Sequence, residues 1–312
     1  MYRYIIKRLV LMIPVILGVS LVVFGILALT PGDPASIILG SGATQAEMDA
    51  LNHELGYDKP VIVRYVNWVF DAIRGDLGTS YMTKQPIAST VFGKIPISLT
   101  IAFNAITCAA LLGIPVGILS AVKQDSLLDT IPTSISIFLA SLPAFWLGMM
   151  LMLIFAVRLG WFPTSGIETW QSYILPMLTL GIPYSAQQMR FTRSSMLETI
   201  RQDYIRTARA KGQKERAIIW KHAMKNALMP VITIIGVNFG ALLGGAVVTE
   251  TLFTIPGLGS YIVNGIKQKD VPVVMGGTVV LAILFSFVML LVDLLYAFVD
   301  PRIKAKYAKK GK

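Results

Sequence analysis

The sequence contains little charge and almost no cysteine or histidine. Of its 312 residues, 14% are charged and 54% are hydrophobic, and the mean hydropathy is +0.66. Soluble globular proteins carry about 25% charged residues, so this composition excludes an ordinary soluble domain and indicates a chain that lies largely in a membrane. The single cysteine, Cys108, excludes an internal disulfide and a cysteine-based metal site.

Patterns for catalysis and metal binding are absent as well. The two histidines, His53 and His222, fall on opposite sides of the membrane in the topology derived below, so they cannot share a metal. There is no G-x-x-x-x-G-K-[ST] phosphate loop, which means that any use of ATP has to come from a partner. We also find no nucleophile with a matching base. These absences predict a chain that is not an enzyme and that binds no metal and no cofactor.

The sequence does contain six apolar stretches that are long enough to cross a bilayer, whose core of about 30 Å requires roughly 20 helical residues. They lie near residues 9–29, 97–122, 132–157, 171–189, 228–249 and 273–299. The last of them contains Asp293, and an ionisable residue within a span is a functional candidate. Asp293 lies about two helical turns from the end of its span, which favours pairing with a loop cation over a place on a substrate path.

The cations between these stretches predict the orientation of the chain. Twenty Lys and Arg residues lie in the N-terminus, 123–131, 190–227 and 300–312, against eight in 30–96, 158–170 and 250–272. Because Lys and Arg gather on the cytoplasmic side of membrane proteins, both termini are expected to be cytoplasmic. This asymmetry also accounts for the net charge of +11 without any binding to nucleic acid.

One extracytoplasmic segment, residues 30–96, is large enough to fold. It contains an amphipathic helical pattern over residues 61–73, on which one face is expected to carry Tyr65, Trp68, Val69 and Ile73. We therefore predict three parts, which are a tail with the first transmembrane helix (1–29), a small extracytoplasmic cap (30–96) and a five-helix core (97–312) that includes the loop 190–227. The glycine-rich stretch 239–245 is expected to permit close helix packing.

The loop 190–227 carries ten Lys and Arg against three acids, and each cation would cost about 2.5–3.5 kcal/mol at a bilayer centre. Ser195-x-x-Glu198 has the form of a capping box and predicts a helix that starts there. Gly212 is expected to end this helix. Two apolar stripes follow the helical period, one at Met196, Ile200, Tyr204 and Ala208, and another at Ala217, Trp220 and Met224.

Two interpretations of this loop remain open on charge alone. It is either a solvated basic segment that rests on anionic lipid or a docking element for a cytoplasmic partner. The apolar stripe, the small Ala208 and the bend at Gly212 favour the partner, because a loop that is needed only for its charge does not need a docking face.

The same loop resembles the E-A-A-x-x-x-G loop of ABC-importer permeases. Arg206, Thr207 and Ala208 stand at the E-A-A positions, Gly212 stands at the required distance, and His222 occupies the later Ile position. The forms "DYIRTARAKG" and "HAMKNALMP" are similar to those of the first permease subunit in the dipeptide, oligopeptide and nickel branch. Further similarity to that branch comes in order along the chain, as "ELGYDKP", "RGDLGTSY", "ETLFTIPGLG", "KDVPVV" and "LLVDLLYAFVDPR".

The resemblance implies an all-α integral membrane protein with six transmembrane helices and the type I ABC-importer permease fold. It implies a permease in a bacterial cell membrane that moves peptides or similar small solutes inward. The implied partners are a similar second permease, two cytoplasmic ATPases that bind ATP and Mg, and an extracytoplasmic substrate-binding protein. The implied coupling residues are Arg206, Thr207, Ala208, Arg209, Lys211, Gly212, Glu215 and His222, of which Arg206, Arg209, Lys211 and Glu215 are expected to pair with charges on the ATPase.

Several polar residues and glycines are candidates for the translocation path. Asn104 and Asn238 are polar residues within spans, and each either hydrogen-bonds to a neighbouring helix or lines the pathway. By resemblance, Glu250, Pro256, Gly257 and Gly259 form a gate or a contact with the binding protein. The alternative function is a secondary transporter driven by an ion gradient, but such carriers place carboxylates near the midplane, and the first five spans have none.

Overall fold

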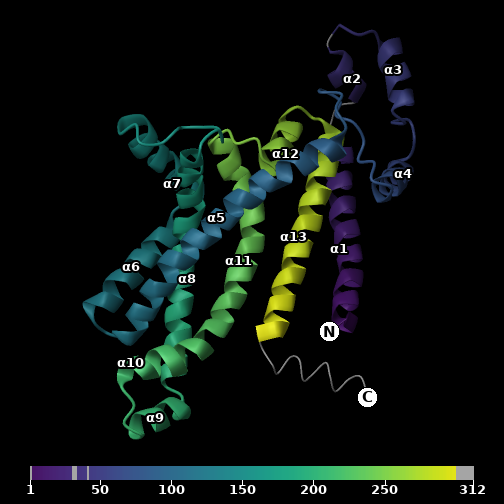
Figure 1. The fold of residues 1–312 in the computed structure, drawn as a ribbon. Helices are drawn as coiled ribbons and strands as arrows, with labels where there is room; N and C mark the ends of the chain where they lie inside the picture. The colour runs from purple at the N-terminus through teal and green to yellow at the C-terminus, as the bar shows by residue number, and fades with distance from the viewer. Residues whose placement is uncertain (1, 30–33, 41, 300–312) are drawn as a thin grey trace. The chain divides into compact units, whose positions relative to one another are not determined.

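The computed structural model describes residues 2–29, 34–40 and 42–299, and the regular elements in these ranges are helices (Figure 1). An isolated antiparallel bridge joins Thr79 to Pro86. The prediction of an all-α chain is therefore confirmed for the described residues. Contacts divide the chain into two compact units, which we describe separately. One is built mainly on Leu99–Ile255 and the described residues from Phe287 onward, and the other on Ile6–Ser98 and Pro256–Ser286.

The second unit contains the first long helix and the predicted cap. Its elements are α1 (Tyr2–Leu29), α2 (Pro34–Leu39), α3 (Gln45–Glu54), α4 (Val61–Ile73), α12 (Leu258–Lys267) and the first parts of α5 (Ile87–Val122) and α13 (Val271–Val299). The amphipathic pattern predicted α4 correctly. Its Tyr65 packs against α1, where the hydroxyl donates to the Leu17 carbonyl at 3.1 Å and the ring meets Phe24 edge-on at 5.4 Å. Ile73, at the end of α4, is exposed.

A buried carboxylate connects the loop after α4 to the start of α13. Asp270 is 1% exposed, and it accepts hydrogen bonds from the Ser80 hydroxyl at 2.6 Å and from the Tyr81 and Met82 backbone N–H groups at 3.1 and 3.3 Å. Beside it, Leu77, Ile87, Val91, Leu258, Ile262, Val273 and Val280 form a hydrophobic core. The motifs "RGDLGTSY" and "KDVPVV", nearly two hundred residues apart, therefore meet in the fold.

The first unit is arranged around α8 (Ile174–Ile200). Around it lie α6 (Leu127–Ser141), α7 (Ala144–Leu151), the π-helical η1 (Met152–Arg158), the short η2 (Trp170–Tyr173) and α11 (Met224–Leu252). The main part of α5 approaches α8 at Gly113 and Gly117. A Cβ on Gly117 would lie 2.6 Å from the Met189 carbonyl oxygen, so only glycine allows this separation. Gly244 and Gly245 face open space instead, and the packing role predicted for them is not seen within this chain.

Four described helices are long and apolar enough to cross a membrane, and a fifth span is counted if one bent pair is included. The four are Ile5–Leu29, Ile87–Val122, Glu215–Leu252 and Val271–Leu295. The predicted span 132–157 is instead the pair Leu127–Ser141 and Ala144–Arg158, bent by 101°. The bend follows from Pro143, which restricts Leu142 to extended backbone, with φ −75° and ψ 130°. The predicted span 171–189 falls in η2 and α8. α8 is long enough to cross a membrane, but it is not apolar enough to count among these candidate spans.

Candidate functional site: a cationic hairpin

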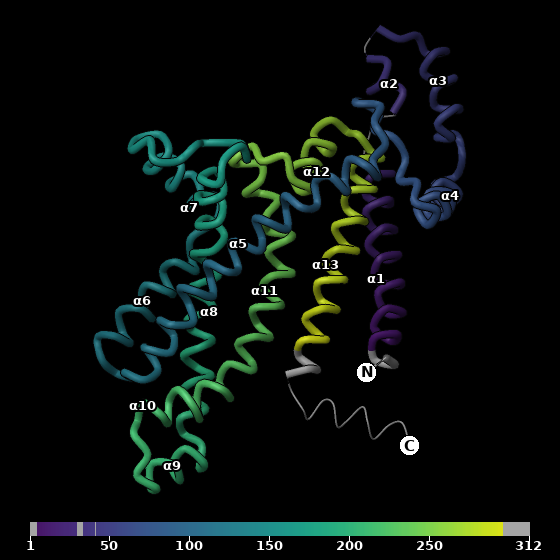
Figure 2. Tube along the Cα trace, in the orientation of Figure 1, coloured from purple at the N-terminus to yellow at the C-terminus, as the bar shows by residue number. Residues whose placement is uncertain are grey.

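The cationic hairpin, residues 201–226, joins α8 to α11 through α9 (Asp203–Ala210), α10 (Glu215–Ala217) and the π-helical η3 (Ile218–Ala223). Figure 2 shows α9 and α10 folded together beside the end of α8 that is remote from α7. The hairpin carries eight Lys and Arg against two acids. Because the chain reverses within a few residues, the hairpin presents a compact cationic surface at one end of the first unit.

The helix predicted to start at Ser195 does not start there. α8 continues to Ile200, and the Ser195 hydroxyl donates to the Ala227 carbonyl of α11 at 2.8 Å instead of capping a helix. The helix α8 ends at Ile200, and α9 begins directly after Gln202, whose backbone is extended. Asp203 lies in the first turn of α9, where a negative charge interacts favourably with the helix dipole.

Gly212 ends α9 as predicted. Its φ is +75°, in the left-handed region that favours glycine, and its N–H donates to the Arg209 carbonyl at 2.9 Å. The next N–H, of Gln213, donates to the Ala208 carbonyl at 3.3 Å, which completes a Schellman motif. A Cβ on Gly212 would meet nothing within 4 Å, so the need for glycine here lies in the backbone conformation and not in close packing within this chain.

The buried residues of the hairpin coincide only in part with the predicted apolar stripes. Its core residues are Met196, Ile205, Ala208, Ile218, Ile219, Ala223 and Ala227, which pack with Ile118 and Ala121 of α5. Tyr204 and Trp220, assigned to the apolar stripes, are exposed. The π-helical turn of η3 changes the helical period, which brings Ile218 and Ile219 inward in place of Trp220. Ala208 is 9% exposed, so its side chain supports the hairpin from within.

Polar contacts hold the two arms of the hairpin together. Arg209 binds Glu215 through two hydrogen bonds of 2.6 and 3.2 Å, and these raise the pKa of Arg209. His222 Nε2 lies 2.8 Å from Gln213 Oε1, and the Asn226 amide donates to the Tyr204 hydroxyl at 2.8 Å. Arg209 and Glu215, which were predicted to pair with charges on a partner, therefore pair with each other.

The remaining predicted coupling residues face outward. Thr207 donates from its hydroxyl to the Asp203 carbonyl at 2.9 Å, and the exposed Arg206 reaches the Asp203 carboxylate at 3.8 Å. Lys211 is exposed at the bend. Trp220 of η3 is 54% exposed and adds a large aromatic surface to the hairpin. Tryptophan and arginine are enriched among the residues that carry most of the binding energy in protein interfaces.

A buried ion pair, which the sequence patterns did not indicate, lies close to the base of the hairpin. Asp129 of α6 has a side chain that is 4% exposed, and its two oxygens accept from Arg193 of α8 at 2.6 and 2.7 Å. The Ser120 hydroxyl of α5 and the Asp125 N–H also donate to this carboxylate. One further α8 cation, Arg190, donates to the Ser136 carbonyl of α6 at 2.8 Å. These contacts fasten α5 and α6 to the helix that carries the hairpin.

The predicted pathway residues are spread over both units. Asn104 is half-buried on α5, Asn238 is buried on α11 with no hydrogen-bond partner for its Nδ2 among the described residues, and Glu250 is fully buried near the end of α11. Pro256 and Gly257 precede α12, and Gly259 lies in its first turn. Asp293 is half-buried on α13. The stretch 256–259, predicted to form a turn, leads directly into α12, with Gly257 at the N-cap position.

Several helices that are long and apolar enough to cross a membrane indicate a polytopic membrane protein, and solved structures show its fold. The fold is similar to that of the inward-facing MetNI methionine ABC transporter, with a TM-score of 0.58 and 19% identity over 68% of this chain and 96% of that chain. It is also similar to an amino acid ABC transporter, with a TM-score of 0.55 and 12% identity over 67% of this chain and 93% of that chain. The fold is therefore that of the type I ABC-importer permeases, as predicted.

The family follows from the sequence comparisons. The model described as "Binding-protein-dependent transport system inner membrane component" matches residues 113–305, and the corresponding N-terminal model matches residues 1–102. The chain belongs to this family and is a membrane permease subunit. It is 40% identical to the glutathione transport system permease protein GsiC of Pectobacterium atrosepticum, over 98% of this chain and all of that one. It is 41% identical to the dipeptide transport system permease protein DppB of Alkalihalophilus pseudofirmus, over 97% of this chain and all of that one.

Proposed function

We propose that the cationic hairpin docks on a partner ATPase and couples ATP-driven closure of that partner to movement of α8 and α11. The observation that supports this most directly is the construction of the hairpin. Its apolar residues and the Arg209–Glu215 pair are used internally, which leaves Arg206, Lys211 and Trp220 on a preformed outer surface. A preformed element loses little conformational entropy when it binds, so it is suited to transmit a movement.

The cargo that best fits this chain is a small peptide. Relatives that match nearly the whole chain at about 40% identity are named for the transport of glutathione and of dipeptides. The family description names a binding-protein-dependent system. We infer that a substrate-binding protein on the extracytoplasmic side selects the peptide and delivers it to this chain and a second permease.

The assembly that we propose has four kinds of subunit, namely this permease, a homologous second permease, two ATPases and the binding protein. ATP and Mg bind to the ATPases, and this chain takes no part in hydrolysis. Both chain ends and the hairpin lie in the cytoplasm, and the segment 30–96 lies outside, as the distribution of Lys and Arg favours.

The test uses the reconstituted importer in proteoliposomes, with peptide uptake and ATP hydrolysis measured in parallel. Trp220→Glu introduces a charge on the outer surface of the hairpin, and we expect both uptake and stimulated hydrolysis to fall at least tenfold, since an aromatic contact at an interface centre is worth about 2 kcal/mol or more. Trp170→Glu is the matched control, because Trp170 is also an exposed tryptophan but lies in η2, outside the hairpin.

Equal activity of the two variants would reject the hairpin as the docking element. Uptake that persists without ATP and collapses when an ion gradient is removed would instead support the secondary transporter.

A further inference from the structure

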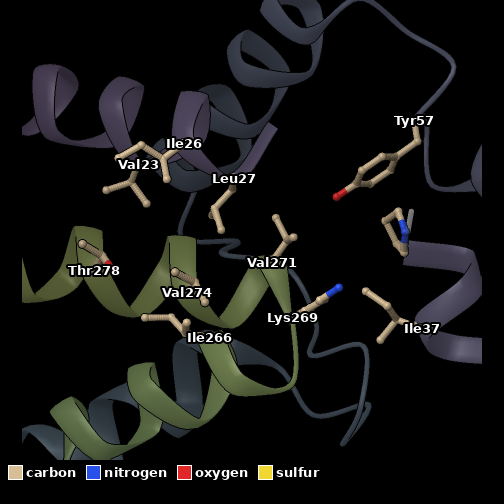
Figure 3. A pocket seen from close by; sticks show the side chains of 11 residues that line it. Val23, Ile26, Leu27, Ile37, Tyr57, Ile266, Lys269, Val271, Val274 and Thr278 are labelled. Carbon is tan, nitrogen blue, oxygen red and sulfur yellow. The ribbon is translucent and has the colours of Figure 1, made fainter. Parts of the chain in front are cut away.

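A cavity of about 340 Å³ lies in the second unit, between the C-terminal turns of α1 and the first turns of α13 (Figure 3). Its walls include Val23 and Leu27 of α1, and Val274 and Thr278 of α13. Figure 3 shows these side chains facing one another across the space. The cavity is at the lower end of the volumes that bind small molecules, so it has room for part of a ligand of moderate size.

One end of this apolar cavity is polar and carries a positive charge. Figure 3 shows the Tyr57 hydroxyl and the Lys269 ammonium group pointing toward the same end of the space. Lys269 is exposed, and within the described ranges its ammonium group has no ion pair or hydrogen bond. The cavity therefore combines an apolar body with a cation at its end.

The backbone of Lys269 is held in place although its side chain is exposed. Its φ is +52°, a conformation that is uncommon for residues other than glycine. The Lys269 N–H donates to the Ile266 carbonyl at 3.1 Å, and the next residue is the buried Asp270, anchored to Ser80 and Tyr81. These contacts fix the point from which the ammonium group reaches the cavity.

The cavity lies near the ends of two candidate membrane spans. α1 and α13 are both candidate membrane spans, Ile5–Leu29 and Val271–Leu295, and the lining residues come from the last turns of the first and the initial turns of the second. These are the turns at which a spanning helix reaches the level of the lipid headgroups. A lysine at this level interacts favourably with anionic lipid, while apolar side chains just below it meet the acyl chains.

We propose that this cavity binds an anionic phospholipid, with one acyl chain between α1 and α13 and the phosphate between the Lys269 ammonium group and the Tyr57 hydroxyl. A peptide fits less well, because its amide groups would be buried against Val23, Leu27 and Val274 without hydrogen-bond partners. The site lies outside the cationic hairpin and adds lipid binding to the proposed function.

Native mass spectrometry of the complete importer tests the site, with phosphatidylglycerol and phosphatidylcholine added in turn to the delipidated complex. Lys269→Glu should reduce retained phosphatidylglycerol about fivefold or more, the factor that corresponds to one cation near an anionic lipid. Lys267→Glu is the matched control, since Lys267 is exposed nearby but does not line the cavity. Wild-type complex should retain more phosphatidylglycerol than phosphatidylcholine.

A second pair of variants tests the acyl-chain part of the site. Val23→Trp fills the cavity and should reduce retention of both lipids, whereas Val22→Trp, on the exposed face of α1, should leave it unchanged. The proposal is overturned if Lys269→Glu behaves like Lys267→Glu, or if the two tryptophan variants behave alike. It is also overturned if the isolated chain retains lipid but the complete importer does not, because another subunit then occupies the cavity.

Discussion

At the residue scale, the Asp129–Arg193 ion pair illustrates how costly a buried charge is and how completely it is compensated here. Both carboxylate oxygens of Asp129 accept from the Arg193 guanidinium, and Ser120 and Asp125 supply further donors. Desolvation makes such a pair weak evidence for net stability, but removal of one partner leaves the other without compensation. We therefore expect the loss of either residue alone to destabilise the chain, because the other would then be a buried charge without its partner.

Asp129→Asn should destabilise the chain by about 3–5 kcal/mol, because the Arg193 guanidinium, 26% exposed, then lies against a neutral amide. The measurement is thermal unfolding of the purified chain in detergent. Arg201→Gln is the control, since Arg201 is exposed and reaches Gln124 at 3.5 Å, a contact worth less than about 1 kcal/mol. Unfolding temperatures that coincide for the two variants would show that the pair carries no stability.

At the element scale, the close approach of α5 and α8 depends on glycine. Gly113 faces the Ser185 carbonyl and Gly117 faces the Met189 carbonyl, so two turns of α5 contact the backbone of α8 directly. Without a hydrophobic driving force between helices in lipid, close packing at small residues contributes to helix association. α8 in turn carries Met196 into the core of the hairpin, so this packing positions the proposed docking element.

Gly117→Ala should destabilise the chain by about 1–3 kcal/mol, because a Cβ there would lie 2.6 Å from the Met189 carbonyl oxygen and 2.8 Å from Thr192 Cβ. Gly244→Ala is a matched control in a helix, since a Cβ on Gly244 meets nothing within 4 Å. Alanine favours a helix over glycine by about 1 kcal/mol, so the control should be neutral or stabilising in unfolding measurements. If Gly117→Ala is no less stable than Gly244→Ala, the α5–α8 contact is not tight.

The elements that the sequence predicted correctly are those fixed by local chemistry. The period of apolar residues defined α4, and the conformational freedom of glycine placed the bend at Gly212. The break at Leu142 was equally local, because Pro143 restricts it, and it was predictable on that ground. Ser195 could not be placed in this way, since its hydroxyl binds a carbonyl 32 residues away. The same holds for the Asp129–Arg193 pair and for the inward turn of Ile218 through a π-helix.

At the scale of the whole molecule, the charge distribution sets the expected orientation. We expect the cationic hairpin and the N-terminus to lie on the cytoplasmic side, with most of the Lys and Arg, and the segment that contains α3 and α4 to lie on the other side. The contrast of 20 against 8 cations is large because the hairpin alone supplies eight of them. The docking proposal depends on this orientation, since ATP is hydrolysed in the cytoplasm.

Cysteine labelling measures the orientation directly, because Cys108 is the single cysteine and Cys108→Ser gives a chain without thiols. In that background, Glu54→Cys on α3 and Lys211→Cys at the hairpin bend place exposed thiols on the two predicted sides. A membrane-impermeant maleimide added to intact bacterial spheroplasts should label Glu54→Cys at once and Lys211→Cys only after permeabilisation. Glu54→Cys is expected to keep uptake, since Glu54 is exposed and lies outside the proposed docking surface. Labelling of Lys211→Cys in intact spheroplasts would place the hairpin outside, where no ATPase can drive it.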